Sequence, residues 1–485
     1  MLSPSIEEHH KKIKEGASLA TEVDNLFSNI EKKDESINSF ISLNKENALK
    51  AVEESEKRFK EGKDIRPLEG SIFSVKDMFC VRGTNTTAGS KMLKDFVPDY
   101  DATVIQRLKN AGAIIVGKTN QDEFAMGSTN EMSYFGPCMN PWNKEHVSGG
   151  SSGGSAASVA ARFAQVSLGT DTGGSVRQPA HFCGTVGLKP TYGRISRYGV
   201  VAFASSLDQT GFFSLKVEDA FKVAQEVSGK DIKDNTTSSS TDAVYHPGET
   251  SDLKGFKVGI VKEFDDTEVD DDIKKAVEES KKALTDKGAE LIEVSLPLVD
   301  HGVPAYYLIA TSEAASNLSR YDGVRYGHRT DKAGEVSLDE FYTLNRSEGF
   351  GIEVKRRILL GNFSLSSGYI EAYYRKACQL RRLMREDYFK SFSKVDAILA
   401  PVASSTAFKL HAFDGKPLKK FLNDYFTVTV NLAGLPGLTV PVKKDSSGLP
   451  IGVQLIANQF KENNLYKAGL CLEESFQFYK EVPSV

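Results

Sequence analysis

The chain has 485 residues, of which 40% are apolar and 26% are charged, and its formal net charge is −4. This is the balance of a soluble globular protein with a large core, and a nearly neutral charge gives no support for a nucleic-acid-binding face. Five scattered cysteines without a CxxC pair exclude a disulfide framework, and the eight histidines form no metal-ligand motif. No apolar run is long enough to span a bilayer. We therefore expect a soluble intracellular protein.

Helical periodicity organises the first sixty residues. Ser3 and Pro4 are typical of a helix start, and Gly16 interrupts the helix that follows. The segment AVEESEKRFKEG, residues 51–62, predicts a further charged helix that ends at Gly62. Between them, the apolar residues recur at helical spacing: Leu19, Val23, Leu26, Phe27 and Ile30.

From residue 69 onward, strand patterns alternate with helix patterns. GSIFSVKDMFCV, residues 70–81, predicts a strand, and DATVIQRLKNAGAIIVG, residues 101–117, predicts a helix, a stop at Gly112 and a second strand. Residues 254–297 repeat this order around an amphipathic helix. Its apolar face is expected to carry Ile273, Val277 and Leu284. Such alternation predicts an α/β fold with a large mixed, mostly parallel central sheet that helices cover on both faces.

The remaining segments receive simpler predictions. Residues 235–252 are polar and contain Pro and Gly, which indicates a surface loop or a junction between subdomains. Residues 305–395 are expected to be mainly helical. FTVTVNLAGLPGLTVPV, residues 426–442, and GLPIGVQLIA, residues 448–457, are expected to return to strand because they are rich in β-branched residues.

One glycine- and serine-rich segment, HVSGGSSGGSAASVAARF at residues 146–163, needs a specific explanation. A flexible linker is disfavoured because small, helix-compatible residues follow directly. A phosphate-binding loop would need a Lys and a Ser or Thr after the glycines, and neither is there. A nucleophile elbow with Ser151 at its centre fits G-x-S-x-G, but it would require a strong strand before it, which MNPWNKEH is not, and a histidine partner.

A second glycine cluster follows in VSLGTDTGGSVRQPAHFCG, residues 166–184. Paired glycines allow successive N–H groups to point at one centre, so Ser175 would lie beside an oxyanion hole, although a tight turn with a capping serine is the commoner explanation. A serine nucleophile needs a base, and strand alternation places Ile72, Ser74 and Lys76 on one face. A buried amine could accept a proton at neutral pH. Lys76 taken alone is more simply a strand-end lysine paired with Asp77.

These motifs together resemble the amidase signature family: GGSSGGSAASVAA, then GTDTGGSVRQPA, with an upstream lysine in SVKD. The resemblance implies the fold of that family and a Ser–cis-Ser–Lys triad. In it Ser175 is the nucleophile, Ser151 is the bridging serine after a cis peptide bond, and Lys76 is the base. Ser151 and Ser175 are 24 residues apart, as in the family. The implied oxyanion hole is formed by backbone N–H groups of residues 172–175, with Thr172, Gly173 and Gly174 as its principal members.

Longer stretches resemble the glutaminase subunits of tRNA-dependent amidotransferases, among them KTNQDEFAMGSTNEMSYFG, EVKRRILLG and NLAGLPGLTVP. The resemblance implies that Arg357 binds the α-carboxylate of glutamine, that Asp424 binds its ammonium group and that Tyr306 lines the pocket. Taken singly, Arg357 could be a solvated helix residue and Asp424 a helix cap. Asp171 and Arg177 are expected to brace the nucleophile loop.

The same resemblance implies a single domain over residues 1–485, with N-terminal helices at 1–66, the catalytic core at 67–215 and the substrate pocket within 216–485. It implies no cofactor or metal in this chain. The partners would be subunits B and C, or a C-like replacement, and a partner would use ATP and Mg²⁺ and hold the charged tRNA. The location would be the bacterial cytoplasm or the mitochondrial matrix, and no membrane is expected.

Two departures from the family pattern are visible: Ser148 replaces a usual proline, and DQTGFF at 208–213 replaces the common DQIGP. Three alternatives remain open at this point. One is a free-standing amidase, which would need no charged pocket; another is a non-catalytic scaffold, which would have no need of the three triad residues. The third is an elbow hydrolase that uses Ser151 and a histidine.

Overall fold

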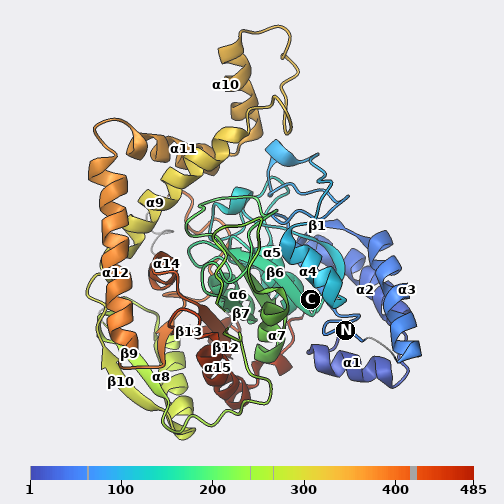
Figure 1. Ribbon diagram of the computed structural model, residues 1–485, viewed down its shortest axis with the longest axis vertical. Coiled ribbons are helices and arrows are strands. Elements are labelled where there is room, and N and C mark those ends of the chain that lie inside the picture. The colour runs from blue at the N-terminus through green and yellow to red at the C-terminus, as the bar shows by residue number, and fades with distance from the viewer. Residues whose placement is uncertain (1, 63–64, 241, 266, 416–422, 485) are drawn as a thin grey trace.

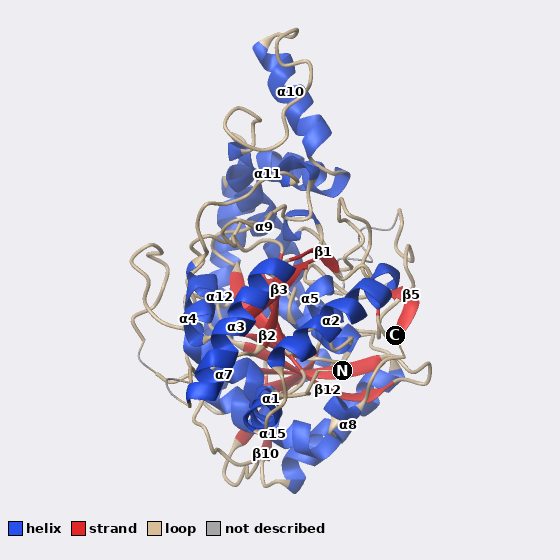
Figure 2. Ribbon diagram, turned by 90° about the vertical axis from the view of Figure 1, so that its right-hand side faces the viewer, coloured by secondary structure: helices blue, strands red, loops and turns tan. Residues whose placement is uncertain are grey.

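The computed structural model describes residues 2–62, 65–240, 242–265, 267–415 and 423–484. A large central sheet runs through the molecule, with helices against both of its faces (Figures 1 and 2). The predicted α/β architecture with a large mixed central sheet is therefore confirmed, but among the described strands six of the ten pairings in that sheet are antiparallel, so it is not mostly parallel. Within the described ranges, no helix combines the length and the apolar character needed to cross a bilayer.

The central sheet has eleven strands in the order β1-β3-β2-β6-β8-β7-β12-β13-β11-β9-β10. Parallel pairing joins β2 to β3 and β6, and joins β9 to β10 and β11, whereas the other neighbours are antiparallel. The strands are β1 (Phe40–Leu43), β2 (Ile72–Lys76), β3 (Ile114–Thr119), β6 (Val166–Asp171), β7 (Val186–Lys189), β8 (Gln209–Ser214), β9 (Lys257–Val261), β10 (Glu290–Val294), β11 (Ala397–Pro401), β12 (Gly437–Lys444) and β13 (Pro450–Ala457).

Two helical layers enclose this sheet. One face is covered by α5 and α6, with the N-terminal helices α2 and α3 beyond, and the other face by α4, α7, α8 and α15. The bounds of the helices in these layers are α1 (Ile6–Lys14), α2 (Leu19–Lys33), α3 (Lys45–Glu61), α4 (Thr103–Ala111), α5 (Gly153–Ala160), α6 (Arg177–Cys183), α7 (Val217–Val227), α8 (Asp271–Asp286) and α15 (Glu462–Phe476).

A separate group of helices packs around its own apolar core at one end of the molecule. In both views α10 and α11 lie at the opposite end of the long axis from α15 (Figures 1 and 2). This group confirms the prediction that residues 305–395 are mainly helical. Its members are α9 (Gly302–Asn317), α10 (Leu338–Gly349), α11 (Ile352–Leu365), the π-helix η7 (Glu371–Arg375), α12 (Lys376–Phe392) and α14 (Tyr425–Leu432).

Several local predictions are confirmed. The buried residues of α2 are the five apolar residues whose spacing predicted the helix. α3 ends at Gly62 and α4 at Gly112, both with positive φ, which a residue without a Cβ adopts readily. The alternation of β2 is also as expected: Phe73 and Val75 face the core beneath α4 and α7, whereas Ile72, Ser74 and Lys76 face α5.

One local prediction is wrong. Residues 425–432 form helix α14 and not a strand, although Val and Thr alternate there. In a helix, Thr427 and Asn431 lie one turn apart on one face, and both bond to the turn after β6, so tertiary contacts override the β propensity. The segment before Gly149 contains a short hairpin of β4 (Met139–Asn140) and β5 (Asn143–Val147), which lies outside the central sheet.

Candidate active site

Lys76, the last residue of β2, lies at the centre of a cluster of hydroxyl groups. Its side chain is fully buried. Nζ is 2.8 Å from each of three oxygens: Oγ of Ser151, Oγ of Ser152 and Oγ1 of Thr170. These three partners come from the segment before α5 and from β6, the neighbouring strand. The position of Lys76 at the end of β2 therefore places its amine in direct contact with Ser151.

The charge of Lys76 is set mainly by burial. Desolvation lowers the pKa of Lys76 to about 7, and the negative charges of Asp122, Asp171 and Asp208 oppose that shift only in part. The interpretation of Lys76 as a partner of Asp77 is wrong, because Asp77 forms a buried ion pair of 2.7 Å with Lys118. A substantial fraction of Lys76 is therefore neutral at physiological pH and able to accept a proton.

The glycine-rich segment packs closely against its surroundings. The peptide bond between Gly150 and Ser151 is cis, as predicted. A Cβ atom on Gly150 would overlap the carboxylate of Asp122, so only glycine fits there. The amide of Gly150 donates to Oε1 of Gln178 on α6 over 3.0 Å, which ties this segment to the helix that follows Ser175.

Asp171 organises the turn that carries Ser175. Its carboxylate accepts hydrogen bonds from the amides of Gly174 and Val176, at 2.8 and 3.2 Å. Arg177 forms an ion pair with the same carboxylate, with both side chains fully buried and two contacts of 3.0 Å. Although burial alone would raise it, the guanidinium of Arg177 holds the pKa of Asp171 well below its usual range. The predicted bracing role of this pair is confirmed by these contacts.

Ser175 lies in this turn, half-buried and two residues before α6. Its hydroxyl makes no hydrogen bond with the described residues, so the structure joins Lys76 to Ser151 but shows no bond between Ser151 and Ser175. The amides of Thr172, Gly173 and Ser175 also have no acceptor in the described part of the chain. The assignment of Gly174 to the oxyanion hole needs correction, because its N–H already donates to Asp171. The available N–H groups are those of residues 172, 173 and 175.

A cavity of about 380 Å³ contains the predicted binding arginine. Arg357, on α11, is buried, and its Nε donates to Oε1 of Glu353 over 2.7 Å. Burial alone would lower the pKa of Arg357, but the carboxylate of Glu353 raises it, so the guanidinium is charged. Asp424, at the start of α14, accepts a hydrogen bond of 2.9 Å from the hydroxyl of Tyr307.

Tyr307 connects the two charged residues. The guanidinium of Arg357 lies 5.4 Å from the centre of its ring, while its hydroxyl bonds to Asp424. The sequence pointed instead to Tyr306. The ring of Tyr306 packs against the turn that carries Ser175, since a Cβ on Gly173 would lie 2.5 Å from its Cζ. The two consecutive tyrosines thus join the charged cavity to the turn that carries Ser175.

Sequence reasoning missed two members of this site, Tyr307 and Glu353. Both had a signal that could have been used: Tyr307 is adjacent to Tyr306 in YY, and Glu353 lies one helical turn before Arg357. An arginine and an acid at this spacing on a predicted helix are expected to interact.

The histidine required by an elbow hydrolase is not at Ser151. His181, on α6, is held by the backbone: its Nδ1 accepts a hydrogen bond of 2.8 Å from the amide of Gly452, and its Nε2 donates to the carbonyl oxygen of Ser405 over 3.1 Å. Burial lowers the pKa of His181 to about 4, so the ring is neutral and structural. The side-chain hydroxyl of Ser151 is held by Lys76 instead. These contacts do not support the elbow interpretation.

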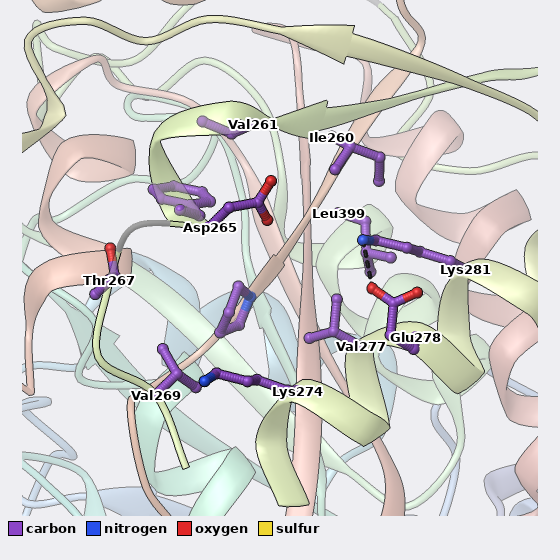
Figure 3. Close-up of a pocket in the computed structure, with 12 residues that line it drawn as sticks. Ile260, Val261, Asp265, Thr267, Val269, Lys274, Val277, Glu278, Lys281 and Leu399 are labelled. Carbon is purple, nitrogen blue, oxygen red and sulfur yellow. Dashed lines mark hydrogen bonds and ion pairs between the residues drawn. The ribbon is translucent and has the colours of Figure 1, made fainter. Parts of the chain in front are cut away.

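Another cavity, of about 310 Å³, lies between the ends of β9 and β11 and helix α8 (Figure 3). Its walls are mainly apolar, with residues such as Ile260, Val277 and Leu399. Lys281 points across it and is paired with Glu278 over 2.6 Å. It contains none of the predicted site residues. Among the described residues, no group of three or more His, Cys, Asp or Glu side chains could hold a metal ion.

Comparison with known proteins gives a consistent result over nearly the whole chain. The family model described as Amidase matches residues 22–466. The A subunit of glutamyl-tRNA(Gln) amidotransferase from Bdellovibrio bacteriovorus is 51% identical over 446 residues, which cover 92% of this chain and 91% of that protein. The protein of the same name from Lachnospira eligens is 50% identical over 465 residues, 96% of each chain. The crystal structure of the corresponding A subunit from Thermotoga maritima has a TM-score of 0.80 at 36% identity, covering 97% of this chain and 94% of that one.

Proposed function

The chain belongs to the amidase family, and from that premise we propose that it is the glutamine-hydrolysing subunit of a tRNA-dependent amidotransferase. The observation that carries the proposal is the fully buried amine of Lys76. It lies 2.8 Å from the hydroxyl of Ser151, and burial lowers its pKa to about 7. The names of relatives about 50% identical to the chain supply the substrate class.

The reaction begins with a proton relay. Neutral Lys76 accepts a proton from Ser151 as Ser151 accepts one from Ser175, and Oγ of Ser175 attacks the carboxamide carbon of glutamine. The N–H groups of Thr172, Gly173 and Ser175 receive the oxyanion, which needs preorganised donors. The relay then returns the proton to the leaving nitrogen, so the C–N bond breaks and ammonia departs. Water attacks the acyl-enzyme by the same relay and releases glutamate.

The charged cavity accounts for selectivity towards a free amino acid. Glutamine has one carboxylate and one ammonium group besides its carboxamide. Arg357 offers a charged fork for the carboxylate and Asp424 offers an acceptor for the ammonium. Because Glu353 already bonds to Arg357, the substrate carboxylate would bind to the remaining donors of the guanidinium or compete with Glu353. An aryl or lipid amide would have no use for both charges.

The word subunit in the names of the relatives supports a larger assembly. We propose that ammonia passes to a companion subunit that uses ATP and Mg²⁺ to activate a misacylated Glu-tRNA(Gln) or Asp-tRNA(Asn). The companion and a third, smaller subunit would correspond to subunits B and C. In this scheme the chain itself holds no cofactor, and contacts with tRNA are made mainly by the companion.

A complex carrying Ser175→Ala tests this proposal. The chain is co-expressed with the companion subunits from the same genome, and amidation of misacylated tRNA is measured with glutamine or with ammonium chloride as the nitrogen donor. We expect the variant to lose glutamine-dependent amidation while keeping ammonium-dependent amidation, which controls for folding and assembly. Substantial glutamine-dependent activity in the variant, or a wild-type complex that transfers no nitrogen to tRNA, would contradict it.

A further inference from the structure

The outer side of α11 presents an unusual amount of apolar surface. Large side chains project from it at helical spacing, and the most exposed of them is Leu359 at 69%. Phe363 continues the same stripe and contacts Tyr369, with ring centres 4.6 Å apart. We call this surface the α11 face. It consists of Leu359, Leu360, Phe363, Tyr369 and Tyr373, whereas Ile352, at the start of the helix, is exposed at the cavity that contains Arg357.

The inner side of the same helix carries the proposed substrate pocket. Arg357 points inward, two residues before Leu359 of the α11 face. Gly361 lets α11 approach α9 so closely that a Cβ there would overlap the carbonyl oxygen of Thr311. The start of α11 is fixed too, because the amide of Gly351 donates to Oε2 of Glu123 over 2.9 Å. One helix thus links an exposed apolar surface to the charged cavity.

Two lysines lie beside the α11 face, and the charge of one of them, Lys355, acts on the carboxylate of Glu123. Lys376 is exposed and follows η7 directly, and Lys355 lies on α11 itself. Within the described ranges neither forms an ion pair, and Lys355 bonds only to the carbonyl oxygen of Ser347, at 3.1 Å. By contrast, Arg375 is matched by Glu371 over 2.6 Å. An apolar centre bordered by an exposed lysine that forms no ion pair is complementary to an apolar surface bordered by carboxylates.

We infer that the α11 face is the docking surface for the companion protein subunit, and that docking restrains α11 and so positions Arg357 for glutamine. This inference rests on the proposed function. Soluble monomers rarely expose a contiguous patch of large apolar side chains, and aromatic anchors near the centre of an interface contribute much of its affinity. Phe363, Tyr369 and Tyr373 are such anchors. The occupant is a protein with an apolar patch rimmed by Asp and Glu.

Charge introduced into the α11 face tests the inference. The variants are Leu359→Asp and Phe363→Asp, with Ile232→Asp, at an exposed residue after α7, as the matched control. The chain and the companion subunits are purified together, and the dissociation constant and the KM for glutamine are measured. We expect association at least about 30-fold weaker for both variants and unchanged for the control. We also expect the KM of each variant to stay at the isolated-chain value when the companion is added.

Leu359→Asp and Phe363→Asp should keep the wild-type thermal unfolding temperature, because the altered side chains are already exposed. Lys376→Glu changes a lysine beside the α11 face and leaves the apolar side chains intact. It should also weaken association with the companion. The inference that the α11 face is a docking surface is wrong if Leu359→Asp and Phe363→Asp bind the companion as tightly as the wild type does. It is also wrong if the wild-type chain never associates with a companion. A KM that does not respond to the companion in the wild type overturns the coupling to Arg357.

Two further measurements exclude other occupants. If the variants abolish dimerisation of the isolated chain but not assembly with the companion, the surface binds a second copy and the inference is wrong. If they abolish tRNA binding but not assembly, it binds RNA and the inference is again wrong. Glutamine hydrolysis by the wild-type complex is followed in parallel. Its absence would refute the proposed function, while the association constants would still decide which surface docks the companion.

Discussion

Replacing Lys76 by methionine tests the central electrostatic property of the site. Lysine has an ordinary pKa of 10.5, and burial lowers the pKa of Lys76 to about 7 in the folded protein. Between these two values the unfolded chain binds one more proton than the folded chain. The free energy of unfolding of the wild type must therefore rise with pH from about 7 to 10.5, and the cost of the buried lysine is largest at and below pH 7.

The magnitude follows from the size of that shift. A difference of about 3.5 pKa units corresponds to roughly 5 kcal/mol at 1.36 kcal/mol per unit, as an upper value for the cost at neutral pH. Lys76→Met fills a similar volume and carries no proton, so it lacks this cost. Between pH 7.5 and 9.5 the wild type should gain about 2–3 kcal/mol relative to the variant.

Urea denaturation of both proteins at the two pH values measures this difference. Taking the difference between variants removes the contributions of all other titrating groups, which the two chains share. Lys390→Met, at an exposed lysine of α12, serves as the control and should show no such pH dependence. A stability difference between wild type and Lys76→Met that is the same at both pH values would refute a depressed pKa for Lys76, and with it the proton relay.

Three further outcomes are expected. Glutamine hydrolysis should fall about tenfold per pH unit below pH 7, because only the neutral amine of Lys76 accepts a proton; a rate that does not change between pH 5.5 and 7 would exclude it as the base. Arg357→Lys should raise the KM for glutamine roughly 10- to 100-fold with a smaller effect on kcat, since the fork geometry is lost, and steady-state kinetics in which kcat falls more than KM rises would contradict the binding role. Asp171→Asn should destabilise the fold by about 3–5 kcal/mol in urea, because Arg177 becomes an unpaired buried charge; a loss below 1 kcal/mol would mean that other groups stabilise Arg177.

The parts of the fold that follow a strict period could be predicted from the sequence. The alternation along β2 separated Phe73 and Val75 from Ser74 and Lys76, because a strand places successive side chains on opposite faces. Helix α14 could not be predicted in this way. Its Val and Thr residues favour a strand, and only the contacts of Thr427 with a turn distant in the sequence explain the helix.

Some residues of the candidate site could likewise be predicted from the sequence, and others could not. The three proposed triad residues lie in motifs with a fixed spacing, so sequence reasoning could nominate them, and the structure brings two of them, Lys76 and Ser151, into contact. The charged cavity is assembled from α9, α11 and the segments 127–132 and 413–415, and Asp424 is bonded to it through Tyr307. The spacing of residues within one helix says nothing about distances between such segments. That is why Tyr307 was missed and Tyr306 was chosen. Likewise, only coordinates reveal that Asp171 has already engaged the N–H of Gly174.

The neutrality of Lys76 depends on how the neighbouring charges are paired. Asp77 is next to it in the chain but bonds to Lys118 at 2.7 Å, and Asp171 is bonded to Arg177 at 3.0 Å. Asp122, Asp171 and Asp208 together oppose the effect of burial on Lys76 only in part. Among the described residues the amine bonds only to hydroxyl groups. Burial then dominates and lowers the pKa. A carboxylate in direct contact with Lys76 would keep it protonated and unable to act as a base, so the separate ion pairs around it are as necessary to the proposed chemistry as the triad.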